Sequence, residues 1–410
     1  MVLSPDHTAP TATVAVYYNV GFRNEPRNRT GYAHLFEHLM FQGSKNLPKG
    51  EFDKLTEGNG GINNGSTRFD FTNYFEVMPA NKLEPILWAE ADRMRGVALT
   101  PASLANQQGV VKSEVRVNVL NQPYGGFPWL DMPQKANKNW NNAHNFYGDL
   151  ADLDAATLQD ALGFFKTYYT PSNAVLAVVG DFEPAEAKAM VEKYFANIPS
   201  APRPAKPDLT EPRQEQEQRF TKDDKLANKP ALAFAYHMPD RNTPEYYAMI
   251  LLDQLLLQGK DSRLYQALVQ KRGYTDDVSG GINYLGNAFN YSGPMLWMGN
   301  LTYDSSVSAD SVLGAVNQTI GRLQQQGVSQ ADLDLALVKL RSSLYDNLQS
   351  GFGRADLLAA FALFDNDPAR INTLEAEFRK VTPALMQQTV RDYLRPTNRT
   401  ILIVNPLAKS

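Results

Sequence analysis

The sequence predicts an α+β fold of two structurally related domains, each a mainly antiparallel sheet packed with helices. Its 410 residues leave room for two to four domains of ordinary size. Residues 197–216, rich in proline and polar side chains, divide the chain almost in half. Each half mixes strand and helix patterns without the strict alternation of a parallel sheet. We therefore predict domains at 1–200 and 217–410, joined by a linker at 201–216.

The two halves also match each other in sequence. Residues 31–43 match 247–259 at an offset of 216, and residues 169–179 match 394–404 at an offset of 225. Both members of the second pair read as the end of a helix, a Pro/Asn turn and a β-branched strand. Two matches in the same order indicate an internal duplication.

Local patterns predict individual elements. Apolar and polar residues alternate over 11–18 and 70–77, as they do in strands with one buried face. Residues 184–195 and 383–394 have helical periodicity, and the apolar run from residue 32 reads as a buried helix that ends near Gly43.

Composition excludes several classes of function. A net charge of −4 without any Lys/Arg block gives no footprint for nucleic acid, and no apolar run is long enough for a membrane span. The chain has no cysteine, which excludes disulfides, thiolate metal sites and a cysteine nucleophile. Any metal must therefore bind to His and carboxylates. A bacterial periplasm and a cytoplasm both fit this composition, and of the two we favour the periplasm.

The sharpest motif is His34-x-x-Glu37-His38. With five histidines in the chain, chance supplies such a pattern on the order of 0.003 times in a sequence of this length. On a helix the three side chains share one face, so two imidazoles can bind one Zn²⁺ beside a carboxylate. Catalytic zinc keeps one position for water and lowers its pKa to about 7, and Glu37 can move that water's proton to the leaving amine. The alternative is a pair of structural histidines beside a paired Glu.

Pattern alone leaves the third metal ligand open. Five acidic residues are candidates: Glu51, Glu57, Glu76, Glu90 and Glu114.

H-x-x-E-H is the inverted zinc signature of the inverzincins, and nearly the whole chain resembles the pitrilysin/insulinase-type peptidases. It is most similar to the branch that contains the mitochondrial processing peptidase and its bacterial relatives. The matching stretches are 20–25, 31–44, 60–67, 173–181 and 261–265. The resemblance implies a zinc endopeptidase whose two domains form half of a clamshell, so that two chains close a chamber around peptides or unfolded segments.

The resemblance also implies roles for single residues. The family's third ligand is a Glu about seventy-five residues after the second His, which corresponds to Glu114, 76 residues after His38. The alternative for Glu114 is a solvated charge paired with a neighbouring Lys112 or Arg116. The family often has a supporting acid seven residues earlier, where this chain has Gln107, and we expect Gln107 to lie on exposed helix surface.

The Gly/Asn-rich segment 58–66 reads on composition alone as a flexible turn. The resemblance instead implies a sheet edge beside the zinc, where a substrate peptide adds as an extra strand and Asn63 matches a substrate-contacting Asn.

The second half is expected to bind no metal and to be catalytically inactive. At the positions of His34, Glu37 and His38 it carries Ile250, Asp253 and Gln254, so we predict one Zn²⁺ per chain. The family's inert half normally supplies an Arg/Tyr pair that binds the substrate and polarises its carbonyl.

In this chain the two positions of that pair fall on Val269 and Asp276, with Arg272 and Tyr274 as possible replacements nearby. The resemblance then implies the zinc-bearing subunit of a bacterial heterodimer whose homologous partner, without zinc, supplies the pair. A homodimer is the alternative.

The sequence therefore predicts a zinc metalloendopeptidase with Glu37 as general base. The competing hypothesis is a non-catalytic scaffold, like the core subunits of respiratory complexes that share this fold but have degenerate zinc motifs. His7, His144 and His237 lack a spaced partner, and we expect them to be exposed or locally hydrogen-bonded. The sequence does not identify the substrate, its cleavage preference or the partner.

Overall fold

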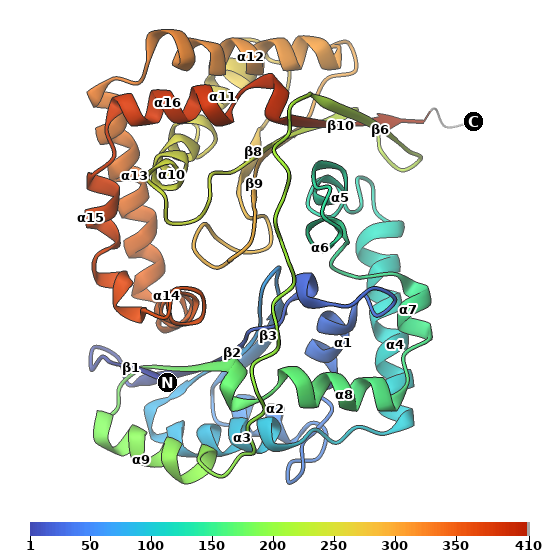
Figure 1. Cartoon of the computed structure of the whole chain (residues 1–410), viewed down its shortest axis with the longest axis vertical. Coiled ribbons are helices and arrows are strands. Elements are labelled where there is room, and N and C mark those ends of the chain that lie inside the picture. Colours follow the sequence, from blue (N-terminus) through green and yellow to red (C-terminus); the bar gives the residue numbers. More distant parts are fainter. Residues whose placement is uncertain (408–410) are drawn as a thin grey trace.

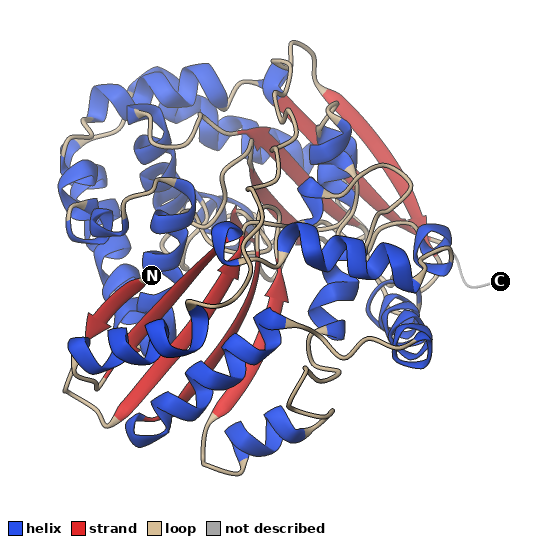
Figure 2. Ribbon diagram, turned by 60° about the horizontal axis from the view of Figure 1, so that its bottom comes forward, coloured by secondary structure: helices blue, strands red, loops and turns tan. Residues whose placement is uncertain are grey.

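The computed structural model describes residues 1–407, which form two five-stranded sheets, one in each half of the chain (Figures 1 and 2). The strands of the first sheet are β1 (Val2–Pro5), β2 (Thr11–Tyr18), β3 (Ile62–Thr67), β4 (Thr72–Pro79) and β5 (Ala174–Gly180). The strands of the second are β6 (Gln218–Asp224), β7 (Ala231–His237), β8 (Ser279–Ile282), β9 (Leu296–Thr302) and β10 (Arg399–Pro406).

The two sheets have the same topology. Their strand orders are β1-β5-β2-β4-β3 and β6-β10-β7-β9-β8. In each sheet one outer pair is parallel, β1 with β5 and β6 with β10, and the other pairs are antiparallel. The predicted α+β class with duplicated, mainly antiparallel sheets is confirmed.

Helices surround both sheets. The first half contains α1 (Tyr32–Leu39), α2 (Glu51–Glu57), α3 (Leu83–Arg95), α4 (Pro101–Val115), α5 (Asp131–Ala136), α6 (Trp140–Ala143), α7 (Leu150–Asp154), α8 (Leu158–Tyr168) and α9 (Pro184–Phe195). Its short 3₁₀ and π segments are η1 (Phe22–Asn24), η2 (Ala80–Lys82), η3 (Arg116–Leu120) and η4 (Pro171–Asn173).

The second half is built in the same way. Its helices are α10 (Pro244–Leu256), α11 (Arg263–Tyr265), α12 (Ala309–Gln326), α13 (Gln330–Gln349), α14 (Gly351–Phe364), α15 (Leu374–Arg379) and α16 (Pro383–Tyr393). Its short segments are η5 (Gln266–Gln270), η6 (Pro368–Asn372) and η7 (Pro396–Asn398). No helix among residues 1–407 combines the length and the apolar composition that crossing a bilayer requires.

Strand β2 shows how the first sheet is packed. Its alternation places Val14, Val16 and Tyr18 in the core beneath α1 and α3. The other face carries Ala15 and Tyr17, which are also fully buried. The prediction of one exposed face was therefore wrong, because α14 from the second half covers that face.

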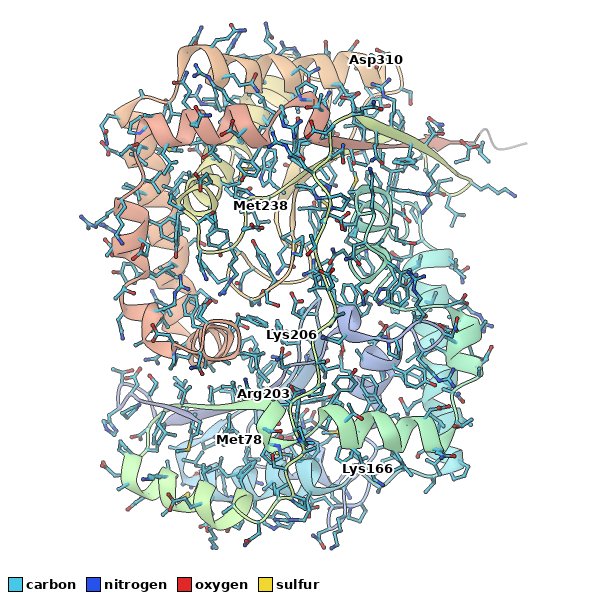
Figure 3. The ribbon with its side chains drawn as sticks, viewed as in Figure 1. Met78, Lys166, Arg203, Lys206, Met238 and Asp310 are labelled. Atoms are coloured by element: carbon cyan, nitrogen blue, oxygen red, sulfur yellow. The ribbon has the colours of Figure 1, made fainter. Side chains whose placement is uncertain are left out.

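Each half contributes a helix to the sheet of the other. Ala355, Leu358 and Ala359 of α14 pack on the first sheet. Conversely, Met132 and Ala136 of α5 pack on the second sheet, where α5 lies beside β10 (Figure 1). Residues 196–217 between α9 and β6 contain no helix or strand and run from one half to the other, with Arg203 and Lys206 along their path (Figures 1 and 3).

Candidate metal centre

Helix α1 presents both motif histidines. It begins after Gly31, which has a φ of +81°, a conformation that glycine adopts without strain. The buried carboxylate of Glu25 accepts hydrogen bonds from the N–H groups of Gly31 (2.8 Å) and Ala33 (2.7 Å). A carboxylate at a helix N-terminus satisfies free donors and opposes the positive end of the dipole. Glu25 therefore fixes the start of the helix that carries His34 and His38.

Helix α4 brings Glu114 to the same place. His34 Nε2 lies 3.2 Å from His38 Nε2. Glu114 Oε2 lies 3.3 Å from His38 Nε2 and 3.6 Å from His34 Nε2. Within residues 1–407 this is the one group of three His, Asp or Glu side chains whose ligand atoms all lie within 4.8 Å of one another.

These distances fit a zinc ion. With ligand bonds of 2.0–2.2 Å, two ligand atoms of a tetrahedral Zn²⁺ lie about 3.3 Å apart. The three measured separations span that value. Two imidazoles and a carboxylate are also a donor set that catalytic zinc uses. The residues present therefore fit the metal.

The protonation states suit metal binding. Burial lowers the pKa of His34 to about 4, against a weaker opposite effect of Glu114, so its imidazole is neutral at pH 7. Burial tends to raise the pKa of Glu114, but the hydrogen bonds with His38 and Tyr147 act in the opposite direction, and the pKa lies below its usual range. A neutral imidazole and an ionised carboxylate are the forms that bind metal.

The ring of His34 is held by packing. Its Nδ1 is buried and has no hydrogen-bond partner among residues 1–407. Phe146 and Tyr147 pack on the ring with centroids 4.5 Å and 5.2 Å away. Metal-bound histidines usually donate their second ring N–H to an acceptor, so here aromatic contacts set the orientation instead.

Glu37 lies next to the group without belonging to it. Its Oε2 accepts a hydrogen bond of 2.7 Å from Thr67 Oγ1 at the end of β3. Burial raises the pKa of Glu37, while the Thr67 hydroxyl and the charges of His38 and Arg68 act in the opposite direction. A carboxylate with a raised pKa is suited to accept a proton near neutral pH.

The other candidates for a third ligand have different partners. Glu76 and Glu90 are fully buried and flank Arg93. Glu51 pairs with Lys54 at 2.7 Å on α2, and Glu57 is exposed at the end of the same helix. Of the two alternative partners of Glu114, Lys112 is engaged elsewhere, since it pairs with Asp154.

Within segment 58–66, residues 58–60 form a turn, as composition predicts, whereas 62–66 belong to the edge strand β3. Asn63 donates its side-chain amide to Asp53 (3.0 Å) and Thr56 (2.8 Å) on α2. Gln107 is only 4% exposed, so its predicted exposure was wrong. It lies on the inner face of α4 two turns before Glu114, and α4 packs against α1.

The second half has a counterpart of this site without metal ligands. Ile250, Asp253 and Gln254 line a cavity of about 480 Å³ beside the edge strand β8. Asp253 accepts hydrogen bonds from Trp297 Nε1 (2.7 Å) and Gln258 Nε2 (3.0 Å). Burial raises the pKa of Asp253 to about 6.

The residues at and near the expected positions of the Arg/Tyr pair pack in the core, face solvent or bond to neighbouring residues. Val269 packs against the core of the second half, and Asp276 is fully exposed and lies 3.5 Å from Lys229. Arg272 donates to Ala267 O and to Gln318 on α12. Tyr274 packs against the same core as Val269.

Four residues at the site escaped the sequence-based prediction. Thr67 binds Glu37, Glu25 caps α1, and Tyr147 donates to Glu114 Oε1 at 3.0 Å. His144 makes the expected local contact, with Nδ1 3.1 Å from the carbonyl oxygen of Trp140, but it also lies 3.3 Å from Glu25 Oε2, 119 residues away. Only the position of Glu25 shortly before the motif could have indicated a cap.

The two remaining histidines lie away from the group. His7 is exposed and pairs with Asp181 at 2.6 Å. His237 lies 3.1 Å from the carbonyl oxygen of Ala136 on α5.

The chain was compared with known proteins. The sequence model of the insulinase domain (peptidase family M16) matches residues 1–125, and that of the peptidase M16 inactive domain matches residues 155–340. The zinc protease PqqE of Helicobacter pylori is 26% identical over 402 residues, which cover 96% of this chain and 87% of that protein. The human mitochondrial cytochrome b-c1 complex subunit 1 is 24% identical over 198 residues, 48% of this chain and 41% of that protein.

Solved structures agree with these matches. The crystal structure of a protease from Helicobacter pylori aligns with a TM-score of 0.90 at 26% identity, over 98% of this chain and 95% of that one. The two sheets, the two matched domains and this likeness along the full length lead to one conclusion. The chain belongs to the insulinase family of peptidases, family M16.

Proposed function

We propose that this chain is a zinc-dependent endopeptidase that cleaves peptides and unfolded segments. The observation that carries the proposal is the convergence of His34 Nε2, His38 Nε2 and Glu114 Oε2 at distances that fit a tetrahedral zinc. When bound there, Zn²⁺ would polarise the peptide carbonyl and lower the pKa of a bound water towards about 7. The counterpart in the second half lacks such a ligand set, so we propose one zinc per chain.

Residues of this chain transfer the proton of the attacking water and bind the substrate peptide. Glu37, held by Thr67, takes a proton from the attacking water and delivers it to the leaving amine. The free edge of β3 binds the peptide as an added strand through main-chain hydrogen bonds, which tolerates many sequences. Asn63 commits its amide N–H groups to α2, which leaves its carbonyl oxygen to accept a substrate N–H.

Glu37→Gln tests this proposal. The variant should retain about one zinc per chain, because Glu37 is the base and not a ligand. Hydrolysis of an unstructured quenched peptide, assayed with and without the homologous partner subunit, should fall about 10²- to 10⁴-fold. Glu51→Gln is the matched control, since within residues 1–407 the Glu51 side chain pairs only with Lys54, on the same helix α2. Zinc is measured by elemental analysis.

A non-catalytic role as a core subunit is the second candidate. The likeness to cytochrome b-c1 complex subunit 1 over 48% of this chain favours it. Absence of zinc from the purified wild-type chain, or cleavage that Glu37→Gln leaves unchanged, would support the scaffold over the peptidase.

We further propose that the active form is a heterodimer with a homologous subunit that supplies the substrate-binding Arg/Tyr pair. Supporting this, Val269 is packed in the core, Asp276 faces solvent, and Arg272 is engaged with Ala267 and Gln318. Peptide hydrolysis should then be feeble for the purified chain and rise when the homologous subunit of the same organism is added. Equal turnover with and without that subunit contradicts the heterodimer and favours a homodimer.

A further inference from the structure

The loop between α6 and α7 is fastened to the start of α1. His144 pairs with Glu25, and the N–H of Asp149 donates to Thr30 Oγ1 at 2.8 Å. Gly31 and Gly148 allow a close backbone contact: a Cβ on Gly31 would lie 2.4 Å from the carbonyl oxygen of Tyr147, and one on Gly148 would lie 2.2 Å from Gly31 N. The backbone of this loop is therefore fixed relative to the helix that carries His34 and His38.

The side chain of Tyr147 reaches from this loop to α4. Its ring is 5% exposed and packs edge-on against His34, at 5.2 Å and 72°, and near Trp129 at 5.9 Å. Its hydroxyl donates to Glu114 Oε1 at 3.0 Å, and Asn118 Nδ2 lies 3.5 Å from the hydroxyl oxygen. Tyr147 thus connects the two helices that hold the candidate ligands.

The two oxygens of Glu114 have separate environments. Oε1 accepts the Tyr147 hydrogen bond, whereas Oε2 faces the two histidines. A carboxylate without that bond can rotate and offer both oxygens to one metal ion. A tyrosine hydroxyl keeps its proton at neutral pH and can act as the donor in this bond.

We propose that Tyr147 is a positioning residue that holds Glu114 as a one-oxygen ligand and fixes the spacing of α1 and α4. The inference rests on the proposed function, since it requires a metal at His34, His38 and Glu114. Gln107, two turns before Glu114 on α4, does not donate to that carboxylate among the described contacts. Tyr147 supports the ligand from the loop between α6 and α7, and outer hydrogen bonds of this kind raise metal affinity.

Tyr147→Phe tests the proposal, because it removes only the hydroxyl and keeps the ring packing. Zinc affinity, measured by competition with a chromogenic chelator, should fall about 10- to 100-fold. Tyr194→Phe is the matched control: Tyr194 also donates to a glutamate, Glu84, at 2.7 Å, but lies on α9 away from the site. Its zinc affinity should stay within about twofold of the wild type.

A spectroscopic measurement separates positioning from a general loss of structure. The Co²⁺-loaded wild type should show the visible bands of a site with one carboxylate oxygen. In Tyr147→Phe these bands should weaken as Glu114 turns to offer both oxygens and the coordination number rises. Circular dichroism and thermal unfolding of both Phe variants verify the fold, and Tyr147→Leu provides a second variant without the hydroxyl.

The experiments must distinguish a failure of the role proposed for Tyr147 from a failure of the proposed zinc site. Wild-type zinc affinity and wild-type Co²⁺ bands in Tyr147→Phe and Tyr147→Leu would overturn the role of Tyr147 and leave the zinc site intact. Glu114→Ala tests the ligand set itself. If this variant binds zinc with the affinity of the wild type, Glu114 is not a ligand, and the proposed function fails with it.

Discussion

Buried carboxylates in this chain are stabilised in three different ways. Glu76 and Glu90 share the guanidinium of Arg93, and Glu25 accepts backbone N–H groups at a helix start. Asp253, at the position of Glu37 in the second half, accepts hydrogen bonds only from the uncharged Trp297 and Gln258 among residues 1–407. Without a paired cation, burial dominates and raises its pKa to about 6.

Asp253→Asn should therefore change how stability depends on pH. Because the folded pKa of about 6 lies above the ordinary 3.8, the contribution of Asp253 to stability is full below about pH 4 and is lost as the pH rises through 6. The free energy of unfolding of the variant should rise relative to wild type by about 2 kcal/mol between pH 4 and pH 7.5. Urea unfolding at each pH measures this difference.

Asp310→Asn is the control, because the side chain of Asp310 is 77% exposed. A difference between wild type and Asp253→Asn that does not change with pH would show that Asp253 titrates normally in the folded protein.

Residue spacing explains which parts of the site were predictable. His34, Glu37 and His38 lie on one helix, so their spacing alone fixes their common face. Glu114 needed the resemblance to a family, because its helix meets α1 only through tertiary packing. Tyr147 and His144 were missed for the same reason: the path of their loop depends on contacts with Glu25 and Gly31 far away in the sequence.

At the scale of elements, sequence patterns located most strands and helices but not what covers them. The alternation in β2 predicted a strand correctly, yet it could not show that α14 arrives from the other half to cover its second face. Segment 58–66 was ambiguous because Gly and Asn suit both turns and irregular strands; pairing with β4 makes 62–66 a strand, while 58–60 form a turn.

The junction between α1 and the loop that carries Tyr147 is the element contact on which the site depends. Gly31→Ala should destabilise the protein more than Gly50→Ala, although both glycines precede a helix with a φ of +81°. Among residues 1–407, no atom beyond the chain neighbours of Gly50 lies within 4 Å of a Cβ added there, whereas at Gly31 the backbone oxygen of Tyr147 lies 2.4 Å away.

We expect Gly50→Ala to cost about 1 kcal/mol for the left-handed backbone and Gly31→Ala to cost a further 1–3 kcal/mol for the steric clash. Gly31→Ala should also bind zinc more weakly, since the clash displaces Tyr147 from Glu114. Urea unfolding and chelator competition measure the two effects. Equal destabilisation by the two substitutions would show that the backbone at Tyr147 can move away from the added Cβ without lowering the free energy of unfolding.

At the scale of the whole molecule, the two halves are held by packing contacts as well as by the linker. Helix α14 from the second half packs on the first sheet, and α5 from the first half packs on the second sheet. A buried network adds to this contact: Asp356 on α14 accepts from Tyr17 of the first half (2.8 Å) and from Asn287 of the second (2.8 Å). We therefore expect these contacts to hold the two halves together without the covalent linker.

Cutting the linker should leave the molecule assembled. A protease site inserted between Arg203 and Lys206, which lie on the segment that connects the halves (Figure 3), should be cleaved to completion while both fragments elute together at the size of the 45.7 kDa chain. Urea unfolding of the cut protein should depend on protein concentration, as it does for any dimer of folded halves, whereas that of the uncut protein should not. Fragments that elute separately in native buffer would show that α14 and α5 do not hold the halves together without the linker.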